Sequence, residues 1–159
     1  MLYPGVKDGN ELARQATRDV VFTQPVRGAA DRHSRRAPTW RYYFDYSTAK
    51  ERPKHPGGVP HGGEVPYVLN TIDLFEGTKD IVTDGDRAFA RRISDYWFEF
   101  ARTGKPAAKG SAAWPDDRRR QDRTMVFGEN TEVQSNFMRA RLTVFLGVGK
   151  ALGAVLGRQ

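Results

Sequence analysis

The sequence contains no cysteine among its 159 residues. Disulfide bonds, cysteine-ligated zinc and thiol catalysis are therefore excluded, although the cellular compartment stays open. Long apolar runs are also missing. The longest, residues 142–156, is interrupted by three glycines and a lysine, and it falls short of the roughly 20 residues that cross a bilayer. The first residues, Met-Leu-Tyr-Pro-Gly, show no basic segment followed by an apolar one, so we expect neither a signal peptide there nor a membrane span.

Acidic residues are fewer than basic ones, which gives the chain a net charge of +7 and a pI of about 9.9. Such an excess can indicate nucleic-acid binding, because Lys and Arg replace the counterions of phosphates. Here the basic runs are short and lie in three different segments: Arg35-Arg36, Arg91-Arg92 and Arg118-Arg119-Arg120. We therefore interpret them as solvated surface and expect no nucleic-acid partner. Convergence of the Lys and Arg side chains on one face would argue the opposite.

The N-terminal third predicts two helices and a strand. Glu11 follows Asp8 at capping-box spacing, and later apolar residues recur at helical spacing, which predicts a helix over Gly9–Phe22 that stops before the next proline. That proline is expected to start a second short helix, Pro25–Ser34. The segment Thr39–Tyr46 is an aromatic run without Gly or Pro. It predicts a parallel strand that is buried on both faces.

The clearest predicted element is a helix in the middle of the chain. Thr83 or Asp84 is expected to cap it, and Gly104 to end it. Its apolar residues form one stripe, which we interpret as a face packed against the sheet and not as a ligand platform: Phe89, Ile93, Tyr96, Trp97 and Phe100. Further along, a short strand is expected at Arg123–Phe127 and a last helix from about Ser135.

Between the aromatic strand and this helix, residues 47–64 form a predicted loop with three prolines, four glycines and two of the three histidines. From the second half of the loop onward the chain reads Gly57-Gly58-Val59-Pro60-His61-Gly62-Gly63-Glu64-Val65-Pro66-Tyr67-Val68. This segment resembles the histidine loop of type-B carboxylesterases and cholinesterases, in which small residues precede His-Gly-x-Glu and an apolar-aromatic stretch. The resemblance continues to about residue 145, through Leu2-Tyr3-Pro4, residues 17–22, 42–45 and 93–106, Trp114-Pro115 and residues 125–128.

The resemblance implies the fold class and the activity. Residues 1–159 are expected to form the C-terminal part of a carboxylesterase-type α/β-hydrolase domain, mostly helices with one or two sheet strands. The implied reaction is hydrolysis of carboxylic esters through an acyl-serine, with no cofactor and no metal. His61 matches the general base and acid of the family's Ser, Asp/Glu, His triad. Glu64 and Gly62 are expected to support the loop, because the resemblance places the triad acid upstream.

Two parts of such a catalytic centre are absent from the sequence. None of the five serines lies in Gly-x-Ser-x-Gly, which the nucleophile of this family requires, and the glycine-rich oxyanion segment is missing as well. The chain therefore carries one triad member of three, and we expect it to be inert alone. The implied partners are a small ester substrate and a missing N-terminal half, or a partner chain, that carries the serine.

Other interpretations of the histidine loop compete with this one. His61-Gly62-Gly63 resembles the oxyanion motif of lipases, but no nucleophile elbow comes after it. His55, His61 and Glu64 are candidate metal ligands, yet they lie on a Pro/Gly loop and not on one helix face. The main alternative to an enzyme is a non-catalytic binding module on the same scaffold, as in neuroligin-like proteins. The retained histidine favours the enzyme.

Overall fold

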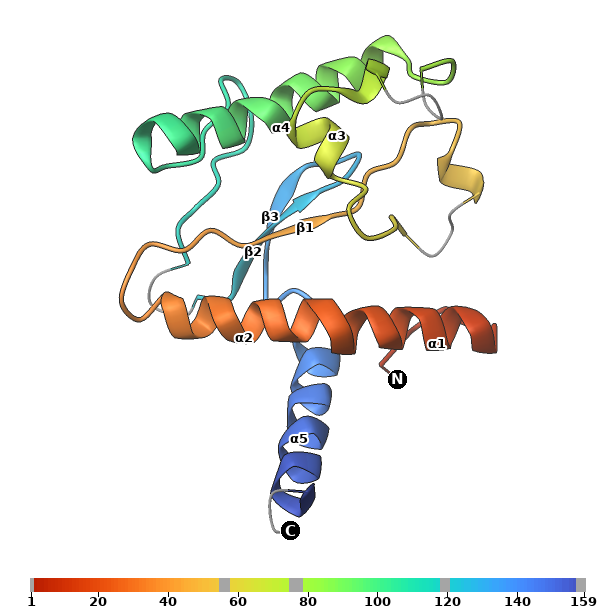
Figure 1. The fold of residues 1–159 in the computed structure, drawn as a ribbon, viewed down its shortest axis with the longest axis vertical. Coiled ribbons are helices and arrows are strands. Elements are labelled where there is room, and N and C mark those ends of the chain that lie inside the picture. The colour runs from red at the N-terminus through yellow and green to blue at the C-terminus, as the bar shows by residue number, and fades with distance from the viewer. Residues whose placement is uncertain (1, 55–57, 75–78, 118–120, 157–159) are drawn as a thin grey trace.

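The structure, a computed structural model, describes residues 2–54, 58–74, 79–117 and 121–156, the last with side chains as far as residue 147. Helices lie on two sides of a small sheet (Figure 1). On one side are α3 (Val65–Val68) and α4 (Asp84–Thr103). On the other side a long rod is formed by α1 (Gly9–Arg18), the π-helical turn η1 (Asp19–Thr23) and α2 (Gln24–His33).

The sheet has three strands in the order β1-β2-β3. β1 (Tyr42–Phe44) runs parallel to β2 (Arg123–Phe127), and β2 runs antiparallel to β3 (Glu132–Ser135). The predicted parallel strand is therefore confirmed, although it is shorter than expected. The expectation that this strand is buried on both faces is wrong, since Tyr42 is 36% exposed. Among the described strands β1 has a neighbour at one edge only, so its other edge lies open.

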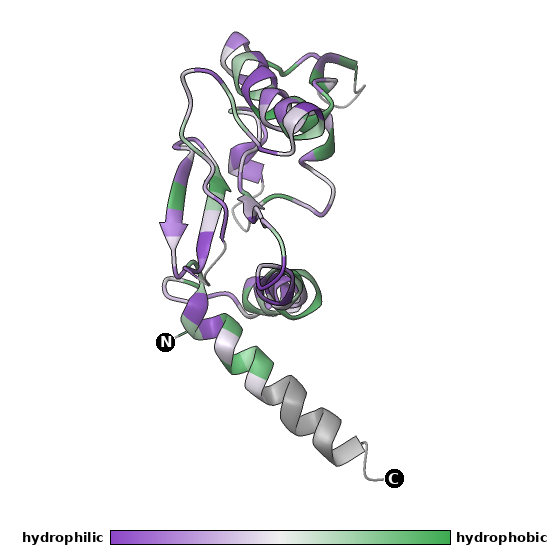
Figure 2. Ribbon diagram, turned by 90° about the vertical axis from the view of Figure 1, so that its left-hand side faces the viewer, coloured by the Kyte–Doolittle hydropathy of each residue, from purple (hydrophilic) through white to green (hydrophobic). Residues whose placement is uncertain are grey.

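The C-terminal part differs from the prediction at one point. The strand over residues 123–127 is confirmed, but β3 comes next as the second arm of a hairpin, and the last helix, α5 (Arg139–Leu156), begins four residues later than expected. α5 leaves the rest of the molecule and extends away from the sheet (Figures 1 and 2). No helix among the described residues is long and apolar enough to cross a membrane. Two short 3-10 turns, Arg52–Lys54 and Ile72–Leu74, complete the fold.

The expected end of the first helix before Pro25 is wrong, because the rod passes through this residue. Asp8 caps its start as predicted, accepting a bond from the Glu11 N–H at 2.8 Å, but the helix then continues without a stop to His33. A proline lacks an N–H and crowds the carbonyl four residues before it. Just ahead of Pro25 the Gln24 N–H reaches the Asp19 carbonyl five residues back, and this wider π turn accommodates the ring inside the rod.

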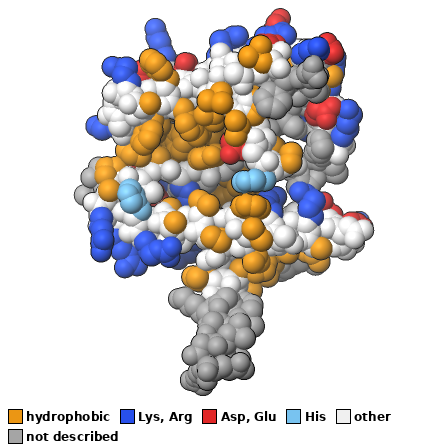
Figure 3. Space-filling view, viewed as in Figure 1, with side chains coloured by type: hydrophobic (Ala, Val, Ile, Leu, Met, Phe, Trp, Pro, Cys, Tyr) orange, Lys and Arg blue, Asp and Glu red, His pale blue; other side chains and the backbone are white. Residues whose placement is uncertain are grey.

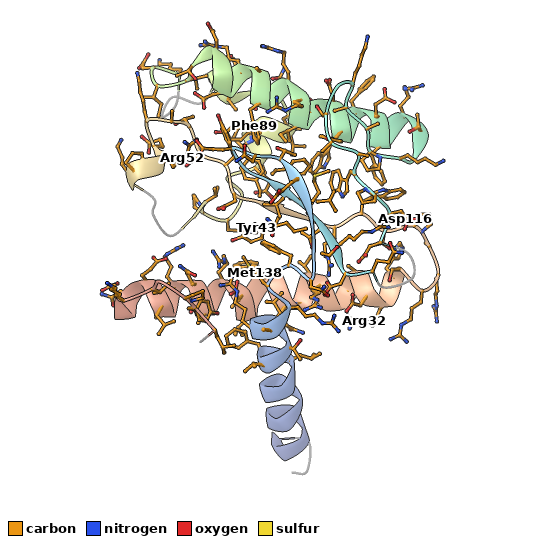
Figure 4. All side chains as sticks on the ribbon, turned by 180° about the vertical axis from the view of Figure 1, so that it is seen from behind. Arg32, Tyr43, Arg52, Phe89, Asp116 and Met138 are labelled. Atoms are coloured by element: carbon orange, nitrogen blue, oxygen red, sulfur yellow. The ribbon has the colours of Figure 1, made fainter. Side chains whose placement is uncertain are left out.

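α4 forms as its sequence predicts. Thr83 and Asp86 make a reciprocal capping box, and Gly104 ends the helix in the left-handed region with φ +74°. Phe89 lies between α4 and the sheet (Figure 4). The predicted stripe is confirmed for its buried members, Phe89, Ile93 and Tyr96, while Trp97 is half-buried. Phe100 is 46% exposed, so its assignment to the buried face is wrong; its ring packs edge-on against Trp40 at the end of the stripe.

The hydrophobic core lies between α3, α4 and the sheet. Phe89 stacks on Tyr46 with ring centroids 3.7 Å apart and an interplanar angle of 12°. The remaining members come from these elements, from the 3-10 turn after α3 and from the Trp114 loop: Tyr67, Ile72, Ala90, Ile93, Tyr96, Trp114, Met125 and Phe127. This side of the sheet is therefore closed by the chain's own aromatic side chains.

Candidate functional site

His61 lies in a tight turn beyond the carboxyl end of β1. The Gly63 N–H donates to the Pro60 carbonyl at 3.0 Å, which makes His61 and Gly62 the two central residues of a β-turn. Gly62 has φ +80°, as the third residue of a type II turn requires. A Cβ on Gly63 would collide with the Val59 side chain and lie 3.0 Å from the Pro60 carbonyl oxygen. Both glycines are therefore needed for the backbone that presents His61.

The turn is fixed to the core by the helix after it. The Val65 N–H donates to the Gly62 carbonyl at 3.1 Å, which links the turn directly to α3. On α3, the buried Tyr67 packs against Phe44 of β1 and Phe89 of α4, with ring centroids 5.2 Å and 5.7 Å away. A short, well-anchored segment therefore carries His61 at the edge of the sheet where α/β proteins place ligands and catalytic groups.

Glu64 precedes α3 and contacts the strand. The Tyr42 hydroxyl lies 3.5 Å from its Oε1, the outer limit for a hydrogen bond. Burial, followed by the charge of Glu64, raises the pKa of Tyr42. In the described part of the chain, the Glu64 carboxylate forms no ion pair with a basic side chain. Its observed contact therefore joins the histidine loop to β1.

The imidazole of His61 is exposed and stacks on one aromatic ring. Phe22, in η1, lies with its ring centroid 4.5 Å from that of His61 and an interplanar angle of 15°. Phe22 is itself 42% exposed. The sequence places Phe22 at the end of a predicted helix and in the family-like residues 17–22, but predicts no contact with His61. The signal that could have singled it out is Pro25, because a proline inside a helical pattern indicates a locally altered helix.

A hollow opens between the rod and the sheet, with the histidine turn at its rim. Its volume is about 550 Å³. Its apolar lining includes residues of the rod, of β1 and of the segment before α5, among them Phe22, Val26, Tyr42, Phe44 and Phe137. Arg14, Arg18, His61 and Glu64 supply polar groups. Hydrophobic side chains gather around this hollow (Figure 3), and Tyr43 lies on the same side of the sheet as the rod (Figure 4).

Asp19 anchors the π turn from inside. Its carboxylate is fully buried and accepts hydrogen bonds from the Tyr3 hydroxyl at 3.0 Å, from Arg18 Nε at 3.1 Å and from the Thr23 hydroxyl at 3.2 Å. Arg141 Nε of α5 lies 3.0 Å from Asp19 Oδ2. Burial and the neighbouring Asp19 raise the pKa of Tyr3 to about 12. The carboxylate thus joins the N-terminus, η1 and α5 at one point.

The structure gives little support to a metal site or to a nucleic-acid-binding surface. Within the described ranges no group of three or more His, Asp or Glu side chains is placed to hold a metal ion; His55 and the run Arg118–Arg120 lie outside those ranges. Several arginines are committed to internal ion pairs, for example Arg27 and Arg41, which bind the two oxygens of Asp122 at 2.5 Å and 2.6 Å. On the face in Figure 3, Lys and Arg lie along the top, at the lower left and at the right, and not in one patch.

Comparison with known proteins identifies the relatives of this chain. A model described as the carboxylesterase family matches residues 6–145. The cocaine esterase of Oryctolagus cuniculus is 35% identical over 99 residues, which are 61% of this chain and 18% of that protein. The para-nitrobenzyl esterase of Bacillus subtilis is 27% identical over 121 residues, 74% of this chain and 24% of that protein.

The solved structures that resemble this chain are esterases, as are the relatives found by sequence. A PNB esterase superposes with a TM-score of 0.61 at 25% identity, over 79% of this chain and 26% of that one. A thermophilic PNB esterase gives a TM-score of 0.66 at 24% identity. The architecture is therefore part of the α/β-hydrolase fold. The chain spans about a fifth of the length of the curated relatives that it matches.

Proposed function

The chain belongs to the carboxylesterase family, and from that premise we propose that it is the histidine-bearing part of a carboxylic ester hydrolase. The observation that carries the proposal is the placement of His61. Its imidazole is exposed, lies on a glycine-dependent turn beyond the carboxyl end of β1, and borders an apolar hollow of about 550 Å³. An exposed, rigidly presented imidazole beside an apolar cavity has the geometry that a general base needs.

The chemistry assigned to His61 is proton transfer in two directions. The imidazole takes the proton from a serine hydroxyl as its oxygen attacks the ester carbonyl carbon, and then gives that proton to the alkoxide of the leaving alcohol. Water repeats the sequence on the acyl-serine and releases the carboxylic acid. Glu64 and Gly62 are proposed to hold the turn, Glu64 through Tyr42 and Gly62 through its left-handed backbone.

The nucleophile and the triad acid are proposed to come from polypeptide outside this chain. The five serines lack the Gly-x-Ser-x-Gly context, and the relatives are several times longer than the stretch that they share with this chain. The open edge of β1 is where such polypeptide would continue the sheet. A small, apolar carboxylic ester is the substrate class that this lining supports, and the reaction as written uses neither metal nor cofactor.

The test is a joined enzyme. This chain replaces the segment that it matches in the para-nitrobenzyl esterase of Bacillus subtilis, and turnover of a para-nitrobenzyl ester is measured. We expect activity that His61→Ala lowers at least about 1,000-fold, because loss of a triad base removes most of the rate enhancement. His33→Ala is the matched control and should retain activity, since His33 lies at the end of α2 and bonds Thr39.

Circular dichroism and thermal unfolding of the joined enzyme establish that each variant is folded before rates are compared. A folded, active joined enzyme in which His61→Ala turns over as fast as the parent would refute the catalytic assignment. It would favour the non-catalytic binding module as the role of this chain.

A further inference from the structure

The stack between Phe22 and His61 bridges two separate parts of the molecule. Phe22 belongs to the rod and His61 to the loop beyond β1, and their rings meet nearly parallel, 4.5 Å apart, at the rim of the hollow. In the part of the chain that the structure describes, neither ring has a second aromatic partner. An exposed imidazole in a glycine-flanked turn has free side-chain rotation unless something contacts it, and here the contact is one phenyl face.

The position of Phe22 depends on the π turn. An α-helix advances 100° per residue, so a turn with one extra residue rotates every later side chain by about that angle relative to the residues before it. Phe22 lies inside this turn, where Pro25 makes a regular α-helix unfavourable. The turn is held from within by the buried Asp19, whose carboxylate binds Tyr3, Arg18 and Thr23. π turns of this kind are frequent at functional sites.

We propose that Phe22 is a positioning residue for His61: the π turn presents its phenyl ring, and the ring fixes the orientation of the imidazole. The effect on turnover rests on the proposed function, whereas the contact itself does not. A stacked ring restricts the side-chain torsions of His61 while leaving both ring nitrogens at the edge free to exchange protons. This division of roles suits a base that must meet a hydroxyl at hydrogen-bond distance in one orientation.

The first experiment observes the contact in the full chain by NMR. The ring protons of His61, assigned with His61→Gln, should resonate upfield of those of His33 because they lie over a phenyl face, and they should show cross-peaks to the Phe22 ring. Phe22→Leu should move them to the position of a free imidazole, and Phe22→Tyr, which keeps the ring, should restore them. Phe137→Leu is the matched control, because Phe137 lines the same hollow but packs against Tyr43 at a tilted angle.

The second experiment works in any state of association. The histidine Cε1 hydrogen–deuterium exchange rate is read by mass spectrometry, with His33 as the internal reference. Phe22→Leu should raise the rate of His61 relative to His33, and Phe22→Tyr should return it to the parent value. In the joined enzyme, Phe22→Leu should lower kcat by about 10- to 100-fold with little change in KM, since misplacement of a catalytic group costs rate and not ground-state binding.

Unchanged His61 signals and exchange in Phe22→Leu would overturn the proposal. A change that Phe22→Tyr fails to restore, or that Phe137→Leu reproduces, would also overturn it, because general packing would then be the cause. Failure of the proposed function looks different: the NMR and exchange results would stand, but His61→Ala would leave turnover of the joined enzyme intact.

Discussion

On one side of the sheet, α3 and α4 close over ten buried residues, most of them aromatic or large aliphatic. On the other side, the rod stands off β1 and leaves a hollow of about 550 Å³ whose lining includes the partly exposed Phe22, Val26 and Tyr42. The same short strand contributes to both sides: Tyr42 and Phe44 pack against Trp97 and Phe89 of α4, whereas the Tyr43 ring faces the rod beneath the Arg18 guanidinium. The difference separates what holds this chain together from what it offers to a substrate or to further polypeptide.

Two polar side chains, Asp86 and His61, illustrate the same difference. On the closed side, the Asp86 carboxylate is engaged in hydrogen bonds within the fold. It accepts them from the Tyr46 hydroxyl at 2.6 Å and from the Thr83 hydroxyl and N–H at 2.6 Å and 2.7 Å. On the open side, His61 has a ring stacked on it but keeps an exposed edge. Satisfied polar groups stabilise a fold, whereas an exposed, oriented imidazole remains available for chemistry.

The sharpest way to break the comparison is the same substitution on both sides. Phe89→Ala removes a fully packed ring and should lower the free energy of unfolding by about 3–5 kcal/mol. Phe22→Ala removes a ring that is 42% exposed and should cost less than about 1 kcal/mol. Urea unfolding followed by tryptophan fluorescence measures both. Equal losses would contradict the distinction between a closed and an open side.

Asp86 gives a smaller effect with a defined pH dependence. Burial alone would raise the pKa of its carboxyl, but the bonds from Thr83, Tyr46 and Ala49 outweigh burial and lower it. A lowered folded-state pKa contributes stability that is present above the ordinary carboxyl range and is lost as the pH falls through the folded value. Asp86→Asn should therefore cost about 1.5–3 kcal/mol at neutral pH, and less as the solution is acidified below about pH 4.

The check on Asp86 is the urea midpoint of the parent chain and of Asp86→Asn, measured from pH 7 down to pH 3. A gap between the two that stays constant over this range would show that the charge of Asp86 is not what its neighbours stabilise.

A substitution of Val26 is expected to change the stability least but to change the apolar surface of the hollow clearly. Val26 lines the hollow and is 56% exposed, so Val26→Arg should alter the free energy of unfolding by no more than about 0.5 kcal/mol. It should nevertheless reduce the binding of a hydrophobic fluorescent dye, because it places a charge on the apolar lining. Val20→Arg, at an exposed position of η1 outside the lining, is the control and should leave dye binding unchanged.

Local signals were sufficient for the elements that depend on local chemistry. The helix over residues 84–103 follows from Thr83, Gly104 and the apolar stripe, and the strand at Arg123–Phe127 follows from its composition. The strand Glu132–Ser135 was not predicted, because this short segment is mostly polar and gives no clear alternation of apolar and polar residues. Its strand conformation depends on pairing with β2. The continuous rod was not predicted because a proline ordinarily ends a helix, and the π turn that admits Pro25 contains Asp19, whose buried contacts come from distant segments.

The site was predictable only in part for the same reason. The glycines around His61 predict a turn, and Gly62 does adopt the left-handed backbone that such a turn requires. The contact with Phe22 joins segments far apart in the sequence and depends on the rotation introduced by the π turn. No periodicity or motif near either residue encodes it, because tertiary packing brings them together.

The measurement that tests the central claim most directly is made on the full 159-residue chain alone. The claim is that this chain supplies a histidine base and no nucleophile. Incubation with a fluorophosphonate probe, followed by intact-mass spectrometry, should leave the chain unmodified, and hydrolysis of a para-nitrophenyl ester should not exceed that of His61→Ala. Stoichiometric labelling of one of the five serines, together with turnover that His61→Ala abolishes, would contradict the claim and make the chain a complete esterase by itself.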